Sequence, residues 1–333
     1  MIPLRPEKNK QPGVWYAVTE DGVELPIMDI THPAFAENAT PDKLAALTAD
    51  FLEFQSSPAF FRRFFASRSI AMRGMNSERN FLHGMTTYVA KLGPKVLGKA
   101  YAGMIDRKVA GGIGSVSFRI RLRDVAHLLA ESLAPVLAAK SGSPLKMLNI
   151  AGGPAMDSLN ALILLQRDHS EWLSGRRISI RVLDLDQTGP RFGVRALQTL
   201  SWQGAPLSGL QVSLEPVTYD WTHPSELVKS TSEIGAGDVS IGSSEGGLFE
   251  YGANDVILEN LRVLRESTPA DFVIVGSIMQ DGPPARSLHA SSQMPIRLFE
   301  LADFKTLVAG AGWSVARALE SSPLYQVVSL KKT

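Results

Sequence analysis

Hydrophobic and polar positions follow two different rhythms along the chain, and the rhythm changes near residue 141. After the linker-like sequence SGSP, apolar runs of strand length alternate with segments of helical periodicity. The expected strand–helix pairs are KMLNIA with Met156–Asp168, ISIRVLDLD with Gly189–Leu200, LQVSLEPVTYD with Pro224–Ser230, GDVSIGS with Asn254–Glu266, and DFVIVGSI with Ile296–Gly310. Two last strands are expected near Trp313–Ala318 and Leu324–Leu330. Strands separated by helical crossovers predict an α/β fold with a seven-stranded, mainly parallel sheet and helices on both faces.

The chain before residue 141 has mostly helical periodicity. Residues 1–13 are polar and predict a loose arm, and Asp21-Gly22 between two alternating apolar runs predicts a β-hairpin. Helices are expected within 41–140, among them 78–92, 94–109 and 119–139, with the glycines of AGGIGS interrupting the pattern. We therefore predict two domains. Residues 1–140 hold the arm, the hairpin and a helical substrate or lid domain, and residues 145–333 hold the sheet.

Four phenylalanines stand out in the first helical stretch. Phe60, Phe61, Phe64 and Phe65 recur at a spacing that places them on one side of a helix. We interpret this side as part of the hydrophobic core rather than as a cofactor or substrate pocket.

Composition narrows the class of protein. The 333 residues include no cysteine, which excludes disulfides, thiolate metal sites and cysteine nucleophiles and agrees with a reducing compartment. No apolar run approaches the roughly 20 residues that span a bilayer, and the first residues lack the hydrophobic centre of a signal peptide. We expect a cytoplasmic protein of about two domains without a membrane partner.

Charge is unevenly distributed although the net charge is only +1. Between Arg62 and Arg123 there are thirteen Lys and Arg against two acids, a local balance of +11, so the remainder carries −10. This asymmetry predicts either solvated helix faces or contact with an anionic substrate or partner. The arginines considered for such contacts are Arg68, Arg73, Arg107, Arg119, Arg121 and Arg123.

The sequence LNIAGGPAMDS, residues 148–158, marks the turn between the first predicted strand of the sheet and its helix. Ligands bind such sheets beyond the carboxyl ends of the strands, where the strand order reverses. Gly152 and Gly153 allow a ligand to approach the backbone, and the exposed N–H groups at a helix start attract electron-rich groups. The other interpretation is a tight turn without a ligand.

Acidic and aromatic residues end the next two predicted strands. Asp184 is placed to accept hydrogen bonds from both hydroxyls of a ribose, whereas we expect Asp186 to cap the next helix, although either acid suits the ribose. Asp220 is placed to accept from an exocyclic amino group, and Tyr219 or Trp221 to lie against an adenine ring. A cap or a packed aromatic is the alternative for each residue.

The order of these features resembles the class I S-adenosylmethionine-dependent methyltransferases. That family commonly has acidic-x-Gly-x-Gly-x-Gly after its first strand, where this chain has Asn149, Ala151, Gly153 and Ala155 and thus a degenerate motif. The resemblance covers about residues 145–331 and includes AGAGWSVARALESSPLYQVVSLKK, which is similar to the family's last helix and closing strand pair.

The resemblance implies a Rossmann-like fold and S-adenosylmethionine as cofactor. It places the cofactor against these residues: Ala151, Gly152, Gly153, Asp157, Asp184, Asp220, Trp221, Ser243 and Ser244. A dinucleotide-binding domain is the competing interpretation, but G-x-G-x-x-G is missing and Asp184 lies 31 residues beyond Gly153 rather than about 20.

The polar, glycine-rich sequence SIGSSEGGLFEYGAND is the best candidate for the wall beside the methyl group. Methyl transfer needs an aligned nucleophile and a group that removes its proton. His289, in the expected loop PPARSLHASSQMP, and Glu245 are the catalytic candidates, and no metal site is expected.

The leading hypothesis is a methyltransferase acting on O or N of a small, anionic molecule. The sequence does not determine the oligomeric state, and a homodimer is compatible with it. The alternatives are a cofactor-binding protein with a regulatory or isomerase-like role and an RNA methyltransferase; no RNA-binding module is recognisable.

Overall fold

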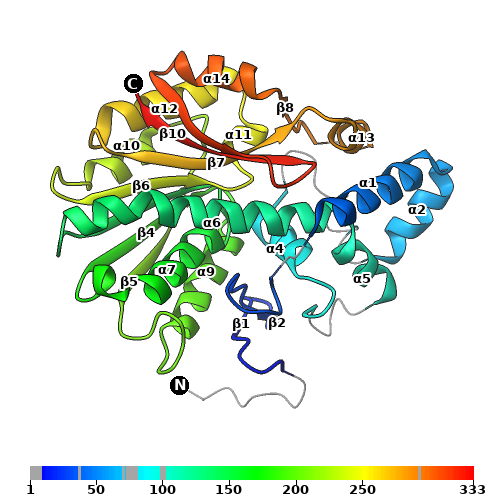
Figure 1. Cartoon of the computed structure of the whole chain (residues 1–333), viewed down its shortest axis with the longest axis horizontal. Helices are drawn as coiled ribbons and strands as arrows, with labels where there is room; N and C mark the ends of the chain where they lie inside the picture. The colour runs from blue at the N-terminus through cyan, green and yellow to red at the C-terminus, as the bar shows by residue number, and fades with distance from the viewer. Residues whose placement is uncertain (1–9, 37–38, 70–71, 73–81, 98–102, 292–293) are drawn as a thin grey trace.

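A computed structural model describes residues 10–36, 39–69, 72, 82–97, 103–291 and 294–333. Its centre is a twisted sheet with helices on both faces, and an N-terminal hairpin and further helices lie beside it (Figure 1). This is the predicted Rossmann-like α/β architecture.

The strand order of the central sheet is β5-β4-β3-β6-β7-β10-β9, with short β8 pairing with β7 as an eighth strand. The strands are β3 (Leu145–Ile150), β4 (Arg177–Asp184), β5 (Gln211–Thr218), β6 (Val239–Ser244), β7 (Val273–Gln280), β8 (Leu298–Phe299), β9 (Trp313–Leu319) and β10 (Tyr325–Lys332). All neighbouring pairs are parallel except those of β10 with β7 and β9. The last two predicted strands therefore form the expected antiparallel closing pair.

Alternate strand residues contribute to two separate cores. Met147 on β3 packs with α6 (Ile113–Ala139), α7 (Met156–Asp168) and α9 (Thr188–Leu200), whereas the next residue, Leu148, packs in the other core. The second core includes α10 (Ser225–Ser232), α12 (Asn254–Ser267) and α14 (Leu301–Ala309). Successive side chains of a strand point to opposite faces, so both faces of the sheet are covered.

The predicted hairpin is present as β1 (Tyr16–Val18) and β2 (Glu24–Pro26). The strands pair antiparallel, and Gly22 in the turn has φ of 82°, which glycine adopts readily. Asn160 on α7 anchors the segment that follows, because its Oδ1 accepts from the Ile30 N–H at 2.8 Å and its Nδ2 donates to Met28 O at 2.9 Å.

Several expected helix boundaries were wrong. α6 starts at Ile113, so part of the glycine-rich AGGIGS lies inside the helix, which packs along the sheet and α7. In the expected 78–92 and 94–109 helices, the described helical residues are α4 (Gly84–Lys91) and α5 (Met104–Gly111). The last crossover helix begins at Leu301 because β8 precedes it. The proposed division at residues 140–145 remains a prediction.

The interpretation of the four phenylalanines as core residues was wrong. They lie on α2 (Ala59–Arg68). Neither this helix nor α1 (Pro41–Ser56) before it has a buried residue. Phe60, Phe61 and Phe64 are 75%, 43% and 55% exposed, so this side of the helix is not part of the core.

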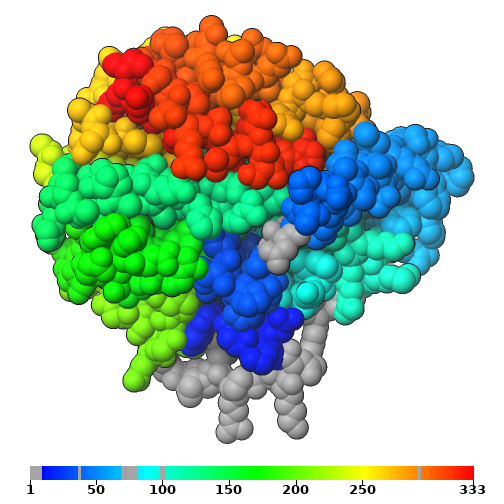
Figure 2. Space-filling model, viewed as in Figure 1, coloured from blue at the N-terminus to red at the C-terminus, as the bar shows by residue number. Residues whose placement is uncertain are grey.

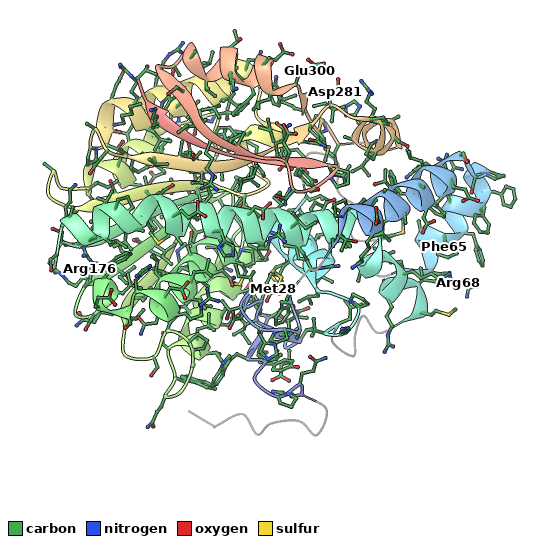
Figure 3. All side chains as sticks on the ribbon, viewed as in Figure 1. Met28, Phe65, Arg68, Arg176, Asp281 and Glu300 are labelled. Atoms are coloured by element: carbon green, nitrogen blue, oxygen red, sulfur yellow. The ribbon has the colours of Figure 1, made fainter. Side chains whose placement is uncertain are left out.

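Arg176 is buried and binds the C-terminal end of the long helix α6, near the amino ends of the strands (Figure 3). Its guanidinium donates to Lys140 O at 3.0 Å and to Ser143 O, and its Nε donates to Trp172 O at 2.9 Å. These bonds satisfy carbonyls at and beyond the helix end, which have no partner within the helix. The carboxyl ends of the strands, at the other edge, hold the candidate site.

Candidate cofactor site

The strand order reverses between β3 and β6. From β3 the chain proceeds through β4 to β5 on one side and then returns to β6 and β7 on the other. The carboxyl ends of β3 and β6 therefore border the crevice in which open α/β sheets bind ligands. Residues 151–155, the turn between β3 and α7, lie at this point.

Every second residue of this turn has a left-handed backbone. Ala151, Gly153 and Ala155 have φ of 53°, 54° and 54°. The methyltransferase family that the sequence resembles commonly has glycine at these three positions. Alanine rarely adopts this conformation. The turn therefore holds a left-handed path at two alanines as well as at Gly153.

Other glycines make room for the turn. A Cβ on Gly84, at the start of α4, would lie 2.6 Å from the Gly153 Cα, and one on Gly189, in α9, would lie 2.9 Å from it. A Cβ on Gly247, after β6, would lie 2.6 Å from the Ala151 Cβ. Helices α4 and α9 and the β6 loop thus contact the turn at backbone distance.

Asn149, the penultimate residue of β3, connects the two borders of the crevice. Its Nδ2 lies 2.7 Å from Asp157 Oδ1, 3.1 Å from Ser158 Oγ and 3.0 Å from Ser243 Oγ. Its Oδ1 has no hydrogen-bond partner, nor has Asp157 Oδ2, although both atoms are buried. A Cβ on Gly152 would lie 1.9 Å from Asn149 Oδ1, so only glycine fits above this amide.

Asp157 is the buried acid of this cluster, with 1% of the residue exposed. Burial, reinforced by the nearby Glu245 carboxylate, raises the pKa of Asp157 to about 6. Unpaired acceptors with little water access cost free energy unless a donor meets them. The geometry suits a ligand that brings a hydrogen-bond donor, preferably a cationic one.

Asp184 ends β4 and faces the same turn. Its Oδ2 accepts from the Gly153 N–H at 3.0 Å and its Oδ1 from the Asp186 N–H at 3.0 Å. Burial raises the pKa of Asp184 to about 6 despite these two bonds. A carboxylate has about four acceptor positions, so Asp184 retains capacity for hydroxyl donors.

Asp186 and the β5 end have more local roles. Asp186 accepts from the N–H of Thr188 at 3.0 Å, at the start of α9, and lies 3.2 Å from His83 Nδ1. Asp220 accepts from the N–H and hydroxyl of Thr222 in an exposed turn. Trp221 is half-buried, whereas Tyr219 is buried and donates to Asn260 Oδ1 at 2.5 Å, so Tyr219 is not available to an adenine ring.

The β6 loop is held by ion pairs. Ser244 Oγ accepts from the Leu248 N–H at 3.0 Å, at the start of α11 (Leu248–Tyr251). Glu245 is buried between the Lys91 ammonium, on α4, and Arg121, whose Nε donates to its Oε1 at 2.6 Å. Burial alone would raise the pKa of Glu245, but the two cations outweigh it and lower the pKa.

Arg121 is not available to an anionic substrate, contrary to the expectation from charge. Its Nη1 also donates to both oxygens of Glu250, at 2.9 and 3.0 Å, and its guanidinium lies over the rings of Phe118 and Tyr325. Arg119 is likewise buried and donates to Ala110 O at 2.9 Å. Arg123 pairs with Asp124, and Arg73 lies outside the described residues.

His289 lies on a helix rather than in a loop. The helix is α13 (Pro283–Ser291), and the residue is exposed there. The roles of Lys91, Glu250 and His83 were not predictable from the sequence, because their partners are up to 154 residues away along the chain. Asn149 had a sequence signal, since an amide replaces the family's acid at that position.

Comparisons with known proteins support the fold. No family model and no curated protein matches the sequence. The solved structure of a possible exported protein from Bordetella parapertussis is similar over 90% of this chain and 99% of that one, with a TM-score of 0.59 and 15% identity. At this identity the similarity shows the fold alone.

Two enzymes are similar over a smaller part. Magnesium protoporphyrin IX methyltransferase from Synechocystis PCC 6803, with bound SAM, has a TM-score of 0.41 at 12% identity, over 66% of this chain and 83% of that one. A 1,6-didemethyltoxoflavin-N1-methyltransferase from Burkholderia thailandensis, with bound S-adenosylhomocysteine, has 0.40 at 16%, over 64% and 78%.

Proposed function

We propose that the chain binds S-adenosylmethionine at the turn after β3 and transfers its methyl group to O or N of a small, anionic molecule. The observation that carries the proposal is the buried, partly unpaired Asp157–Asn149 pair beneath a left-handed turn at the switch point of the sheet. The ligand expected here carries an amino group and a ribose, both of which are hydrogen-bond donors.

The residues present fit such a cofactor. Asp157 Oδ2 and Asn149 Oδ1 would accept from its ammonium group, and Asp184 would accept from ribose hydroxyls. Asp220 and Trp221 remain the proposed contacts for adenine, and Ser243 and Ser244 line the β6 side. The acid that the family has on its first strand is replaced here by an acid eight residues later, on α7.

When bound, the cofactor supplies an electrophilic methyl group, so the chain's own residues would mainly align the acceptor and receive its proton. His289 remains the proposed proton acceptor. Glu245 is less suited to this role, because two cations stabilise its charged form, and its proposed role is to hold the β6 loop.

The second candidate function is a cofactor-binding protein that does not transfer methyl. Two observations favour it: Glu245 is fully paired with cations, and His289 is exposed on α13. A small-molecule substrate, a cytoplasmic location and a homodimer remain parts of the proposal. Among the described helices, none is both long and apolar enough to cross a bilayer.

Calorimetric titration with S-adenosylmethionine, S-adenosylhomocysteine and NAD tests the proposal. We expect micromolar binding of the first two, no binding of NAD, and a loss of at least about tenfold in Asp157→Asn and in Asp184→Ala, because a charge-assisted hydrogen bond contributes about 1.5–3 kcal/mol. Asp271→Asn, an exposed acid before β7, is the matched control and should bind like the wild type.

Two outcomes decide between the alternatives. Wild-type protein that binds neither methionine derivative contradicts both functions. Binding without methyl release, across a set of anionic hydroxyl and amine acceptors, selects the second candidate.

A further inference from the structure

The helices α1 and α2 project from the body of the molecule. In the space-filling view they form an arm that extends beyond the rest of the surface at one end (Figure 2). Neither helix has a buried residue. Helix α1 contacts α6 and α13, and α2 contacts α5, where Lys108 lies over the Phe65 ring. Such an arm adds little to the core and is therefore free to serve an external surface.

The arm exposes large apolar side chains that a core would bury. Phe60 and Phe64, one helical turn apart, are 75% and 55% exposed, and Met104 on neighbouring α5 is 76% exposed. Phe61 is better covered, since its ring packs 5.8 Å from that of Phe65. Exposed apolar groups gathered on two neighbouring helices are typical of an interaction surface.

Basic residues accompany these side chains. The exposed Arg63 and Arg68 lie on α2, and the exposed Arg107 and Lys108 on α5. The only acid in these two helices is Asp106, which is buried and accepts from Ser69 Oγ at 2.6 Å. We call Phe60, Phe64, Met104 and these four cations the arm patch, whose charge is entirely positive.

We propose that the arm patch docks on an anionic lipid surface. Arginine and lysine side chains attract acidic headgroups, and phenylalanine and methionine side chains insert between them to the acyl boundary. This contact needs no bilayer-spanning helix. It departs from our expectation of no membrane partner, which rested on the absence of a spanning run and of a sharply amphipathic membrane helix, although lipid headgroups fit a basic face.

Two other occupants fit the patch less well. A twofold dimer would place the same patch of both copies face to face and so oppose the four cations of one copy with the four of the other. Single-stranded RNA needs free aromatic faces for stacking, but the Arg68 guanidinium lies 5.0 Å from the Phe64 ring centre and Lys108 Nζ lies 5.9 Å from that of Phe65.

Co-sedimentation of the full chain with vesicles tests the inference. We expect binding to phosphatidylcholine vesicles that contain phosphatidylserine, none to phosphatidylcholine alone, and weaker binding as salt is added. Arg63→Glu with Arg68→Glu should weaken partitioning at least about 25-fold, since each basic residue contributes roughly fivefold. Phe60→Ser with Phe64→Ser should weaken it comparably.

Matched controls carry the same changes elsewhere on the surface. Trp202→Ser with Val228→Ser removes apolar groups of 48% and 47% exposure, and Arg177→Glu with Lys331→Glu reverses two exposed charges. Both controls should bind vesicles like the wild type. Thermal melting of every variant verifies folding, and α2 is a safe place for substitution because none of its residues is buried.

Three results would overturn the inference. One is wild-type protein that stays in solution with both kinds of vesicle. Another is tighter binding to polyuridylate than to the anionic vesicles, lost in the same arm variants. The third is a concentration-dependent dimer that the Phe60→Ser/Phe64→Ser variant abolishes while vesicle binding is unchanged. Each is independent of cofactor binding.

Discussion

Ala151 and Ala155 hold a backbone conformation that glycine adopts at much lower cost. In an L-residue the left-handed region brings Cβ close to the following carbonyl and costs roughly 1–2 kcal/mol. The turn keeps this shape because its surroundings determine it: Gly84 and Gly189 press on Gly153, and Gly247 lies against Ala151. Strain that persists in this way concentrates at functional sites.

The two alanines should respond differently to replacement by glycine. Ala151 is half-buried, so Ala151→Gly should raise the free energy of unfolding by about 1 kcal/mol as strain is relieved. Ala155 is fully buried, and the loss of about 0.8 kcal/mol for its methyl group should nearly cancel the relief. Urea denaturation measures both changes.

Ala302→Gly, at an exposed position in the first turn of helix α14, is the control for glycine itself and should lose about 0.5 kcal/mol. If Ala151→Gly loses as much as this control, the left-handed turn is not strained.

At the scale of elements, α4, α6 and the β6 loop are joined by a buried set of charges. Lys91 comes from α4, Arg121 from α6, Glu245 from the loop after β6, and Glu250 from α11, which follows that loop. Ser277 on β7 completes the set by donating to Glu250 at 2.7 Å. Two cations thus meet two carboxylates, and removal of one partner leaves an uncompensated buried charge.

A double-mutant cycle on Lys91→Met and Glu245→Gln measures this coupling. Each single change should lower the free energy of unfolding by about 3 kcal/mol, whereas the double variant should lose clearly less than the sum because no unpaired charge of this pair remains. The exposed pair Arg317–Glu131 is the control and should couple by less than about 1 kcal/mol. Additive losses at Lys91 and Glu245 would contradict an ion pair that joins α4 to the loop.

The elements also differ in how far their sequence reveals them. Most strands and helices after residue 145 were predicted to within about two residues of their ends, because their apolar periodicity is strong and each element contacts its neighbours in the sequence. Two predictions failed there: α14 was expected to begin at Ile296 instead of Leu301, and α13 was expected to be a loop. α6 was predicted six residues too short, since Gly112 precedes the helix while Gly114 lies within it. The phenylalanines of α2 were misplaced because helical spacing shows that side chains share a face, not that another element covers it.

The whole molecule brings the site together from segments far apart in the sequence. Asn149, Asp184 and Ser243 were predictable as neighbours because the carboxyl ends of adjacent parallel strands meet at one edge of the sheet. Lys91 and Gly84 were not, because no local pattern records that α4 lies against the turn. The unpaired oxygen of Asp157 depends on this enclosure and is likewise visible only in the fold.

Enclosure by the whole fold also sets opposite pH dependences for stability and ligand binding. Burial raises the pKa of Asp157 to about 6, whereas an unfolded aspartate titrates near 3.9. Between these values the folded state binds more protons than the unfolded state, so this group's contribution to stability falls as the pH rises from about 4 to about 6 and is then constant. Its charged form costs about 2–3 kcal/mol at pH 7.

Asp157→Asn should therefore unfold with a free energy about 2 kcal/mol higher than the wild type at pH 7 and nearly equal at pH 4, measured by urea denaturation at both values. Affinity for S-adenosylmethionine should move in the other direction in the wild type, rising as the pH increases from 5 to 7, because only the ionised carboxylate pairs with an ammonium group. A ligand affinity that is flat over this range, with the stability difference present, would assign Asp157 to the fold and remove it from the site. If the difference in free energy of unfolding persists at pH 4, the Asp157 carboxyl destabilises the fold through its shape or hydrogen bonding and not through its charge.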